Sequence, residues 1–278
     1  MDTQPLKPCL LMLHGFLGCG SDWDTLTPEL EPHFRLLTPD LPGHGMTPLD
    51  VQFDDRAESQ LGGNGSSPFD KVCLVLLDWL DKHDVTEFHL LGYSLGGRLA
   101  LHLAHMAPSR LLSLNLESCH PGLVSGGDKT ERLAADSRWA EQLASKPLPA
   151  FLDVWYRQGV FAHLDDDARQ ALVARRSGQH KEANRQALVQ MYLATSLANQ
   201  DDLRAVPAAL PCPVNLYVGE WDHKFTGLAN QWQQHQSGIH LFTIQGAGHN
   251  CHAEQPGRFA HSLLQGIFHH SSMGQSHV

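Results

Sequence analysis

The segment Leu90-Leu91-Gly92-Tyr93-Ser94-Leu95-Gly96-Gly97 carries the strongest structural signal in the chain. Strand-forming residues at 87–91 lead into a Gly-x-Ser-x-Gly pattern, and a helical pattern follows at once. This order predicts a nucleophile elbow, a strand-to-helix turn so tight that only glycine fits on either side of Ser94. The serine hydroxyl then stands clear of the sheet, at the positive end of a helix.

Strand and helix patterns alternate on both sides of this elbow. Apolar runs predict further buried strands at 9–13, 34–38, 111–116, 214–218 and 240–244. Helices are predicted from near Asp22 with Ser21 as the cap, from 68 to about 82 with Ser67 as the cap, and at 95–106 and 253–268. This alternation predicts a mostly parallel sheet flanked by helices, and together with the elbow it predicts the α/β-hydrolase fold.

Residues 120–205 break this rhythm, because they show successive amphipathic helices and no convincing strand. We therefore expect residues 1–119 and 206–278 to form the α/β core, and residues 120–205 to form a helical cap over the active site. A polar, Gly-rich stretch at 51–67 predicts a mobile surface loop.

Composition narrows the possible functions. The formal net charge of −10 argues against nucleic-acid binding, and an anionic ligand would need local arginines to overcome this charge. Six scattered cysteines without a CxxC pair indicate reduced thiols and a cytoplasmic location. No signal peptide, membrane span, metal site or cofactor site is predicted, and a monomer or small homo-oligomer is expected.

A serine hydroxyl needs a histidine to take its proton and a carboxylate to fix that histidine. In this fold the order along the chain is serine, acid, histidine, with the last two after later strands. Asp222 follows the strand at 214–218, and His249 follows the strand at 240–244 in a Gly-rich turn. Ser94, Asp222 and His249 are thus the predicted catalytic triad, with Glu220 and Glu117 as alternative acids.

The oxyanion hole requires two backbone amides, which map to Leu95 after the serine and to Phe16 in the loop after the first strand. His14 and His44 are interpreted as anchors of their loops. Three arginines raise a further question: Arg98 lies one helical turn beyond Ser94, while Arg132 and Arg176 lie in the predicted cap. Each alone is typical of a solvated surface, but together they suggest carboxylate recognition.

The chain resembles the MenH family of 2-succinyl-6-hydroxy-2,4-cyclohexadiene-1-carboxylate synthases over almost its whole length. The resemblance lies first in motifs that many hydrolase-fold proteins share, at 13–18, 40–45 and 92–98. More specific are the cap and the last loops: Trp155-Tyr156, Val160-Phe161-Ala162, Arg175-Arg176-Ser177, 194–198, Gly219-Glu220, 222–225 and 247–252. The stretch at 51–67, longer than is usual in the family, and Trp221 depart from the pattern.

This resemblance implies a lyase of menaquinone biosynthesis that eliminates pyruvate from a substrate with several carboxylates. It implies that Ser94 acts as a base, and that Tyr93, Arg98, Arg132, Trp155 and Arg176 line the anionic pocket. Two alternatives stay open. One is a serine hydrolase (an esterase, thioesterase or C–C bond hydrolase) with the same triad, and the other is a catalytically inactive binding protein.

Overall fold

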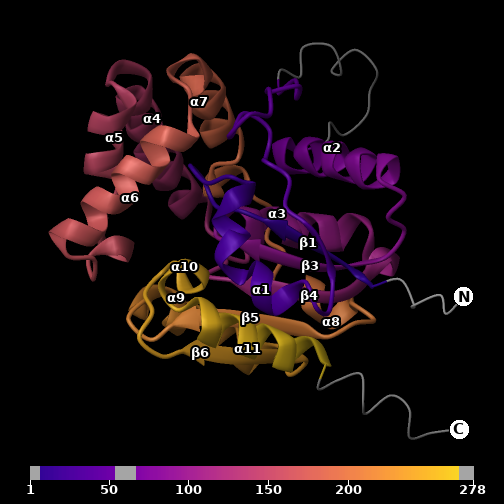
Figure 1. Ribbon diagram of the computed structural model, residues 1–278. Coiled ribbons are helices and arrows are strands. Elements are labelled where there is room, and N and C mark those ends of the chain that lie inside the picture. The colour runs from indigo at the N-terminus through magenta and orange to yellow at the C-terminus, as the bar shows by residue number, and fades with distance from the viewer. Residues whose placement is uncertain (1–6, 54–66, 269–278) are drawn as a thin grey trace, which may run out of the picture.

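A sheet of six parallel strands forms the centre of the molecule, in the order β2-β1-β3-β4-β5-β6 (Figure 1). The computed structural model describes residues 7–53 and 67–268. The strands are β1 (Cys9–Leu13), β2 (Arg35–Leu37), β3 (Phe88–Tyr93), β4 (Leu111–Glu117), β5 (Val214–Gly219) and β6 (Ile239–Ile244). Neighbouring parallel strands place their carboxyl ends at one edge, which is where the predicted site residues follow β3, β5 and β6.

Helices cover both faces of this sheet. On one face lie α2 (Pro68–Lys82), α3 (Leu95–Met106), α8 (Val206–Ala209) and α9 (His223–His235). The other face carries the 3-10 helix η1 (Gly20–Leu26), α1 (Thr27–Leu30), α10 (Cys251–Glu254) and α11 (Pro256–Phe268). The short helix η3 (Pro108–Arg110) connects α3 to β4.

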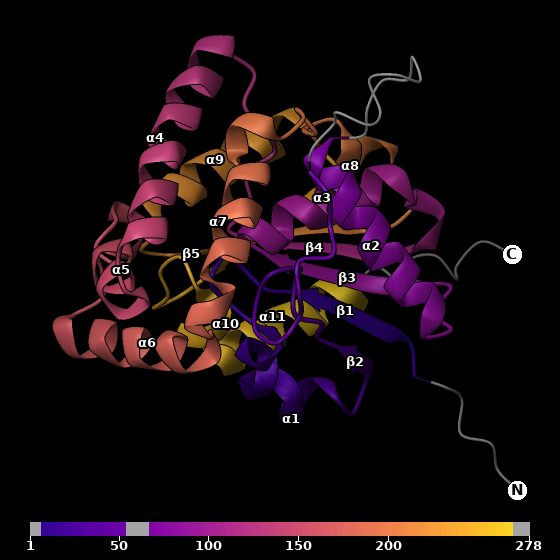
Figure 2. The same ribbon diagram turned by 90° about the horizontal axis from the view of Figure 1, so that it is seen from above.

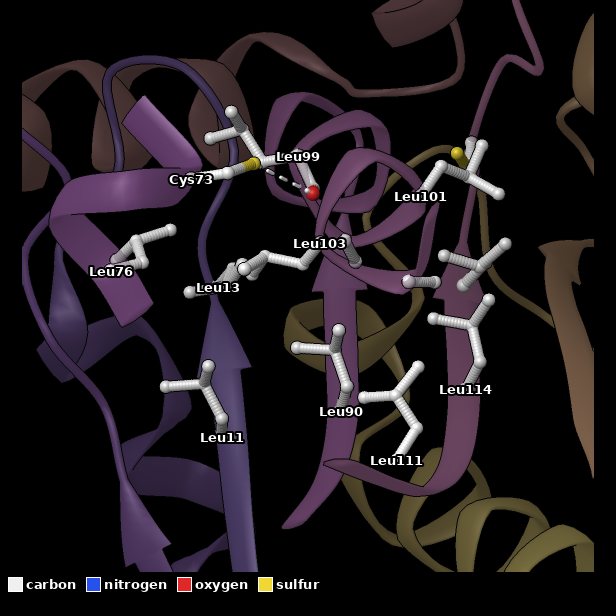
Figure 3. Close-up of a cluster of buried hydrophobic side chains, with 14 of the residues drawn as sticks. Leu11, Leu13, Cys73, Leu76, Leu90, Leu99, Leu101, Leu103, Leu111 and Leu114 are labelled. Atoms are coloured by element: carbon white, nitrogen blue, oxygen red, sulfur yellow. Dashed lines mark hydrogen bonds between the residues drawn. The ribbon is translucent and has the colours of Figure 1, made fainter. Parts of the chain in front are cut away.

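Side chains alternate between the two faces along each strand, as a twofold repeat requires. In β1, Leu11 and Leu13 join the cluster under α2 and α3, while Leu10 and Met12 join the cluster under α11. Figure 3 shows the first of these clusters, where strand leucines meet the leucines of α3 and Cys73 of α2. Both faces are therefore apolar, which explains the continuous apolar runs in the sequence.

The segment between β4 and β5 contains helices and no strand within the described residues. Besides α8, these helices are α4 (Gly126–Ser145), α5 (Leu148–Trp155), η4 (Gly159–Phe161), α6 (Asp166–Gln179), η5 (Glu182–Asn184), α7 (Arg185–Ala194) and η6 (Leu197–Asn199). Figure 2 shows α4, α5, α6 and α7 grouped on one side of the sheet. They share an apolar cluster that also includes Leu17 from the loop after β1. The division into a core and a cap domain stays a prediction, and the word cap refers below to the helices from α4 to η6.

Three local predictions are refined by the structure. Ser67 caps α2 as expected, because its hydroxyl accepts the Asp70 amide at 3.1 Å. Ser21 does not cap the next helix: Cys19 precedes it and Ser21 lies inside the first turn. The last predicted helix is two helices, since the residue before Pro256 is disfavoured in a helical conformation. Most of the predicted loop at 51–67 lies outside the described residues.

Candidate active site

Ser94 occupies a strained turn between β3 and α3, as the elbow pattern predicts. Its φ and ψ are 52° and −106°, in the left-handed region that side chains disfavour. A Cβ on Gly92 would lie 2.3 Å from the Gly96 carbonyl oxygen, and one on Gly96 would lie 2.0 Å from the Leu13 carbonyl oxygen. Both glycines are therefore needed for the close approach of helix and strand.

Ser94, His249 and Asp222 form a hydrogen-bonded chain. The Nδ1 of His249 lies 2.6 Å from Oδ2 of Asp222, and its Nε2 lies 3.4 Å from the Ser94 hydroxyl oxygen. Asp222 caps α9 by accepting the Phe225 amide at 3.2 Å, and it is 4% exposed. With Nδ1–H donating to the carboxylate, Nε2 is left as the acceptor for the serine proton.

The two alternative acids have other partners. The Glu220 carboxylate accepts the Gly246 amide at 2.9 Å. The buried Glu117 carboxylate lies 2.7 Å from Nδ1 of His252. Of the three carboxylates, Asp222 is the one that contacts His249.

The loop after β1 brings Phe16 against the triad and the cap. The Phe16 ring lies 5.4 Å from the Trp155 ring and 4.7 Å from the Tyr192 ring, measured between centroids. His14 anchors this loop: its Nε2 accepts the Leu41 amide at 2.9 Å, so its Nδ1–H donates to the Gly15 carbonyl. Burial lowers the pKa of His14 to about 4, which keeps it neutral. His44 is also buried, and it lies against the rings of His14 and Phe16.

Leu95 is the first residue of α3, where backbone amides have no acceptor within the helix. This position and the place of Phe16 beside the cavity are compatible with the predicted oxyanion hole.

A cavity of about 310 Å³ opens in front of Ser94, between the core and the cap. Its lining includes the predicted residues Phe16, Tyr93, Arg132, Trp155 and His249, together with Asp136, Tyr192, Lys224 and Phe225. Burial, followed by the charge of Glu117, raises the pKa of Tyr93 well above its ordinary value, so this side chain is a neutral wall of the cavity.

A smaller recess of about 80 Å³ adjoins Ser94 and collects positive charge. Arg98, Arg132 and Lys224 line it, together with His120. Arg98 donates to the Thr195 carbonyl at 2.7 Å, and burial, with the nearby charge of Arg132, lowers its pKa to about 10. Burial and Arg132 also lower the pKa of Lys224. Three cations within one recess match an anionic ligand.

No group of three or more potential metal ligands is found within this cavity among the described residues. One group of potential ligands lies elsewhere: Asp70, His102 and Asp201 bring ligand atoms within 4.8 Å of one another. His102 Nδ1 already contacts Asp70 at 3.1 Å, and none of the three lines the cavity.

The chain is similar to known proteins over most of its length. The alpha/beta hydrolase family matches residues 10–262. A protein of Enterobacter sp. (strain 638) named 2-succinyl-6-hydroxy-2,4-cyclohexadiene-1-carboxylate synthase is 39% identical over 94% of this chain and 92% of its own length. A protein of the same name from Citrobacter koseri is 37% identical over 94% of both chains. The chain belongs to this synthase family.

Solved structures agree on the fold. MenH from S. aureus aligns with a TM-score of 0.80 at 23% identity, covering 97% of this chain and 96% of that chain. A thermophilic esterase from Thermogutta terrifontis aligns with a TM-score of 0.74 at 20% identity, covering 94% and 89%. These similarities confirm the α/β-hydrolase fold.

In the described part of this synthase-family chain, no helix is both long and apolar enough to cross a membrane.

Arg176 differs from its expected place in the synthase-type pocket. It is 3% exposed and does not line the cavity, because its guanidinium donates to both oxygens of Asp22 at 2.6 Å. Burial by itself would raise the pKa of Asp22. The charge and hydrogen bonds of Arg176 have the larger opposite effect and lower this pKa below its usual range. This buried pair joins α6 of the cap to η1 of the core.

Two charged residues of the cavity were not predicted as site residues from the sequence. Lys224 stands two residues after the predicted acid Asp222, and that proximity to a predicted site loop is the signal that could have found it. Asp136 follows Arg132 by four residues, about one helical turn. That spacing allows an ion pair on one face of a helix, and it is the signal that could have found Asp136.

Proposed function

We propose that this protein is a lyase of menaquinone biosynthesis. It would eliminate pyruvate from 2-succinyl-5-enolpyruvyl-6-hydroxy-3-cyclohexene-1-carboxylate, giving 2-succinyl-6-hydroxy-2,4-cyclohexadiene-1-carboxylate. Family membership supports the reaction. The structural observation that supports it best is that Arg132 and Lys224 face the triad serine in one cavity. Because the chain carries a net charge of −10, an anionic substrate depends on such local cations.

In this proposal Ser94 acts as the base. Asp222 holds His249 with Nδ1 protonated, so Nε2 takes the Ser94 proton as the serine oxygen removes a proton from ring carbon 2 of the substrate. The electrons released form the conjugated diene while the carbon–oxygen bond to the enolpyruvyl group breaks. The leaving enolpyruvate takes up one proton and becomes pyruvate. No water is consumed and no acyl-enzyme forms.

The remaining cavity residues have supporting roles. The amides of Phe16 and Leu95 would stabilise the enolate charge that develops during proton removal. Arg98, Arg132 and Lys224 would hold carboxylates, with Arg132 as the bidentate donor of the set. Trp155 and Tyr93 would enclose the ring of the substrate.

Serine hydrolase activity is the second candidate, because the complete triad serves nucleophilic attack equally well. Its product would be an acyl-enzyme on Ser94 that water then cleaves. The cationic recess favours the lyase, since an apolar ester pocket has no use for these charges.

A pyruvate-release assay on the cyclohexene substrate tests the proposal. We expect release well above the spontaneous rate. Release no faster than the spontaneous rate would refute the lyase function. A rapid burst of product from an activated ester, with a covalent adduct on Ser94 detected by mass spectrometry, would support the hydrolase instead.

A further inference from the structure

Two consecutive residues at the end of β4 contact both the turn that carries Ser94 and the loop that carries His249. The backbone carbonyl of Glu117 accepts the amide of Ser94 at 2.9 Å. The hydroxyl of Ser118 donates to the carbonyl of His249 at 2.9 Å. The serine turn and the histidine loop are thus fixed to the same dipeptide.

The carboxylate of Glu117 adds a second hold on the histidine loop. One of its oxygens accepts the His252 amide at 3.1 Å, and the other lies 2.7 Å from His252 Nδ1. Both side chains are at most 1% exposed. His252 also packs on the rings of Trp23 and Tyr93, at 4.1 and 5.0 Å between centroids. The loop that carries His249 is therefore attached at two points: at the His249 carbonyl and at His252, three residues later.

The backbone of Ser118 adopts a conformation that is unusual for a residue with a side chain. Its φ is +46°, a conformation that glycine adopts more readily than serine. Its amide donates to the Tyr217 carbonyl at 2.9 Å, which ties this turn to β5, the strand that leads to Asp222. Glycine would suit the backbone, but it cannot supply the hydroxyl that reaches His249.

We propose that Glu117 and Ser118 are positioning residues that set the His249 imidazole at the correct distance from Ser94. They touch no substrate and act through His249. The kinetic part of this inference rests on the proposed lyase function. Because a displacement of about 1 Å in a catalytic group can lower a rate about 100-fold, loss of either hold should lower turnover more than binding.

Ser118→Gly provides the sharpest test, because it removes the hydroxyl while relieving the backbone. We expect kcat for pyruvate release to fall by about 10- to 100-fold, with KM nearly unchanged and a melting temperature that does not decrease. Asp84→Gly is the matched control, since Asp84 also has a positive φ (56°) but lies in an exposed turn after α2. We expect Asp84→Gly to leave kcat unchanged.

A second readout does not depend on the natural substrate. A fluorophosphonate labels a serine when its oxygen attacks phosphorus and fluoride leaves, and His249 must take the serine proton in that step as well. We expect Ser118→Gly to lower the rate constant for labelling of Ser94 in proportion to kcat. Glu117→Gln, which keeps the shape but loses one acceptor for His252, should lower both rates in the same way.

The outcomes separate the two proposals. If the wild type labels but releases no pyruvate, the lyase function fails, and slower labelling of Ser118→Gly still supports positioning. If Ser118→Gly and Glu117→Gln match the wild type in labelling and in turnover, the positioning role is refuted. The positioning role would also be refuted if the variants had a lower melting temperature and a smaller labelled fraction, while the folded molecules reacted at the wild-type rates. A wild type that neither labels nor releases pyruvate refutes both.

Discussion

Asp136 holds Arg132 through both of its carboxylate oxygens, which lie 2.9 and 2.8 Å from the Nε of the arginine. The carboxylate is 2% exposed and also accepts hydrogen bonds from Tyr192 and Ser196, each at 2.7 Å. This pairing uses Nε and so orients the guanidinium at the edge of the cavity. The arginine that we assign to substrate binding is therefore fixed before substrate arrives.

Asp136→Asn should weaken substrate binding. Loss of charge-assisted hydrogen bonds worth about 1.5–3 kcal/mol predicts an increase in KM of about 10- to 100-fold, with a small change in kcat. Steady-state kinetics of pyruvate release measures this. Asp153→Asn is the control, because Asp153 forms the same four-residue pair with Arg157 on the exposed side of the cap. An unchanged KM in Asp136→Asn would contradict the orienting role.

Lys224→Met should raise KM about 10-fold, because it removes one cation from the recess beside Ser94. Lys224→Arg should retain most of the binding. The lowered pKa of Lys224 predicts that KM rises at alkaline pH, where the amine loses its proton, and that Lys224→Arg abolishes this rise. Lys181→Met, at an exposed cap position, serves as the control. Loss of kcat without a change in KM would contradict a binding role.

Ser94→Ala should lower kcat by about 100- to 10,000-fold, the range for loss of general base catalysis. Ser145→Ala, which removes an exposed hydroxyl that donates to the Glu141 carbonyl, should have no effect. Substrate should still bind to the Ser94 variant, as measured by calorimetry. Wild-type turnover by Ser94→Ala would exclude serine as the base.

Arg176→Leu should destabilise the fold, because it leaves the buried carboxylate of Asp22 without its main partner. We expect a loss of about 3–5 kcal/mol in the free energy of unfolding, measured by urea denaturation. Arg175→Ala, whose side chain is 39% exposed, should cost about 1 kcal/mol or less. An increase in KM at unchanged stability would instead place Arg176 in substrate binding.

Acid should destabilise the protein through its buried histidines. The pKa of His14 is about 4 in the folded state against 6.5 ordinarily, so the unfolded chain binds the proton first. The stability from neutral His14 is complete above pH 6.5 and declines as pH falls toward 4, by up to about 3 kcal/mol. His14→Gln should flatten this dependence in urea titrations at several pH values, while His105→Gln, at an exposed position, should not.

The elbow and the meeting of Ser94, Asp222 and His249 can be predicted because each depends on local rules. A Gly-x-Ser-x-Gly turn between strand and helix encodes its own geometry, and the acid and histidine follow strands whose ends must meet at one edge. Arg176 shows the limit of such reasoning. Whether an arginine on a cap helix faces the cavity or a buried carboxylate depends on the packing of α6 against η1. Here that packing brings together Arg176 and Asp22, which are 154 residues apart in the chain.

Lys224 and Asp136 show the same limit, because they line the cavity although the sequence did not predict them there. Both lie in ordinary helical sequence, and they become part of the site only when α4 of the cap folds over α9 of the core. The cavity wall is shared by two segments distant in sequence, so local patterns do not predict it.

Phe16 connects the cap to the predicted oxyanion hole. Its ring is held by Trp155 and Tyr192 of the cap, while its backbone belongs to the loop proposed to stabilise the enolate. Phe16 therefore supplies both a cap contact and a proposed oxyanion-hole amide, so the packing of the cap and the placement of that amide are set together.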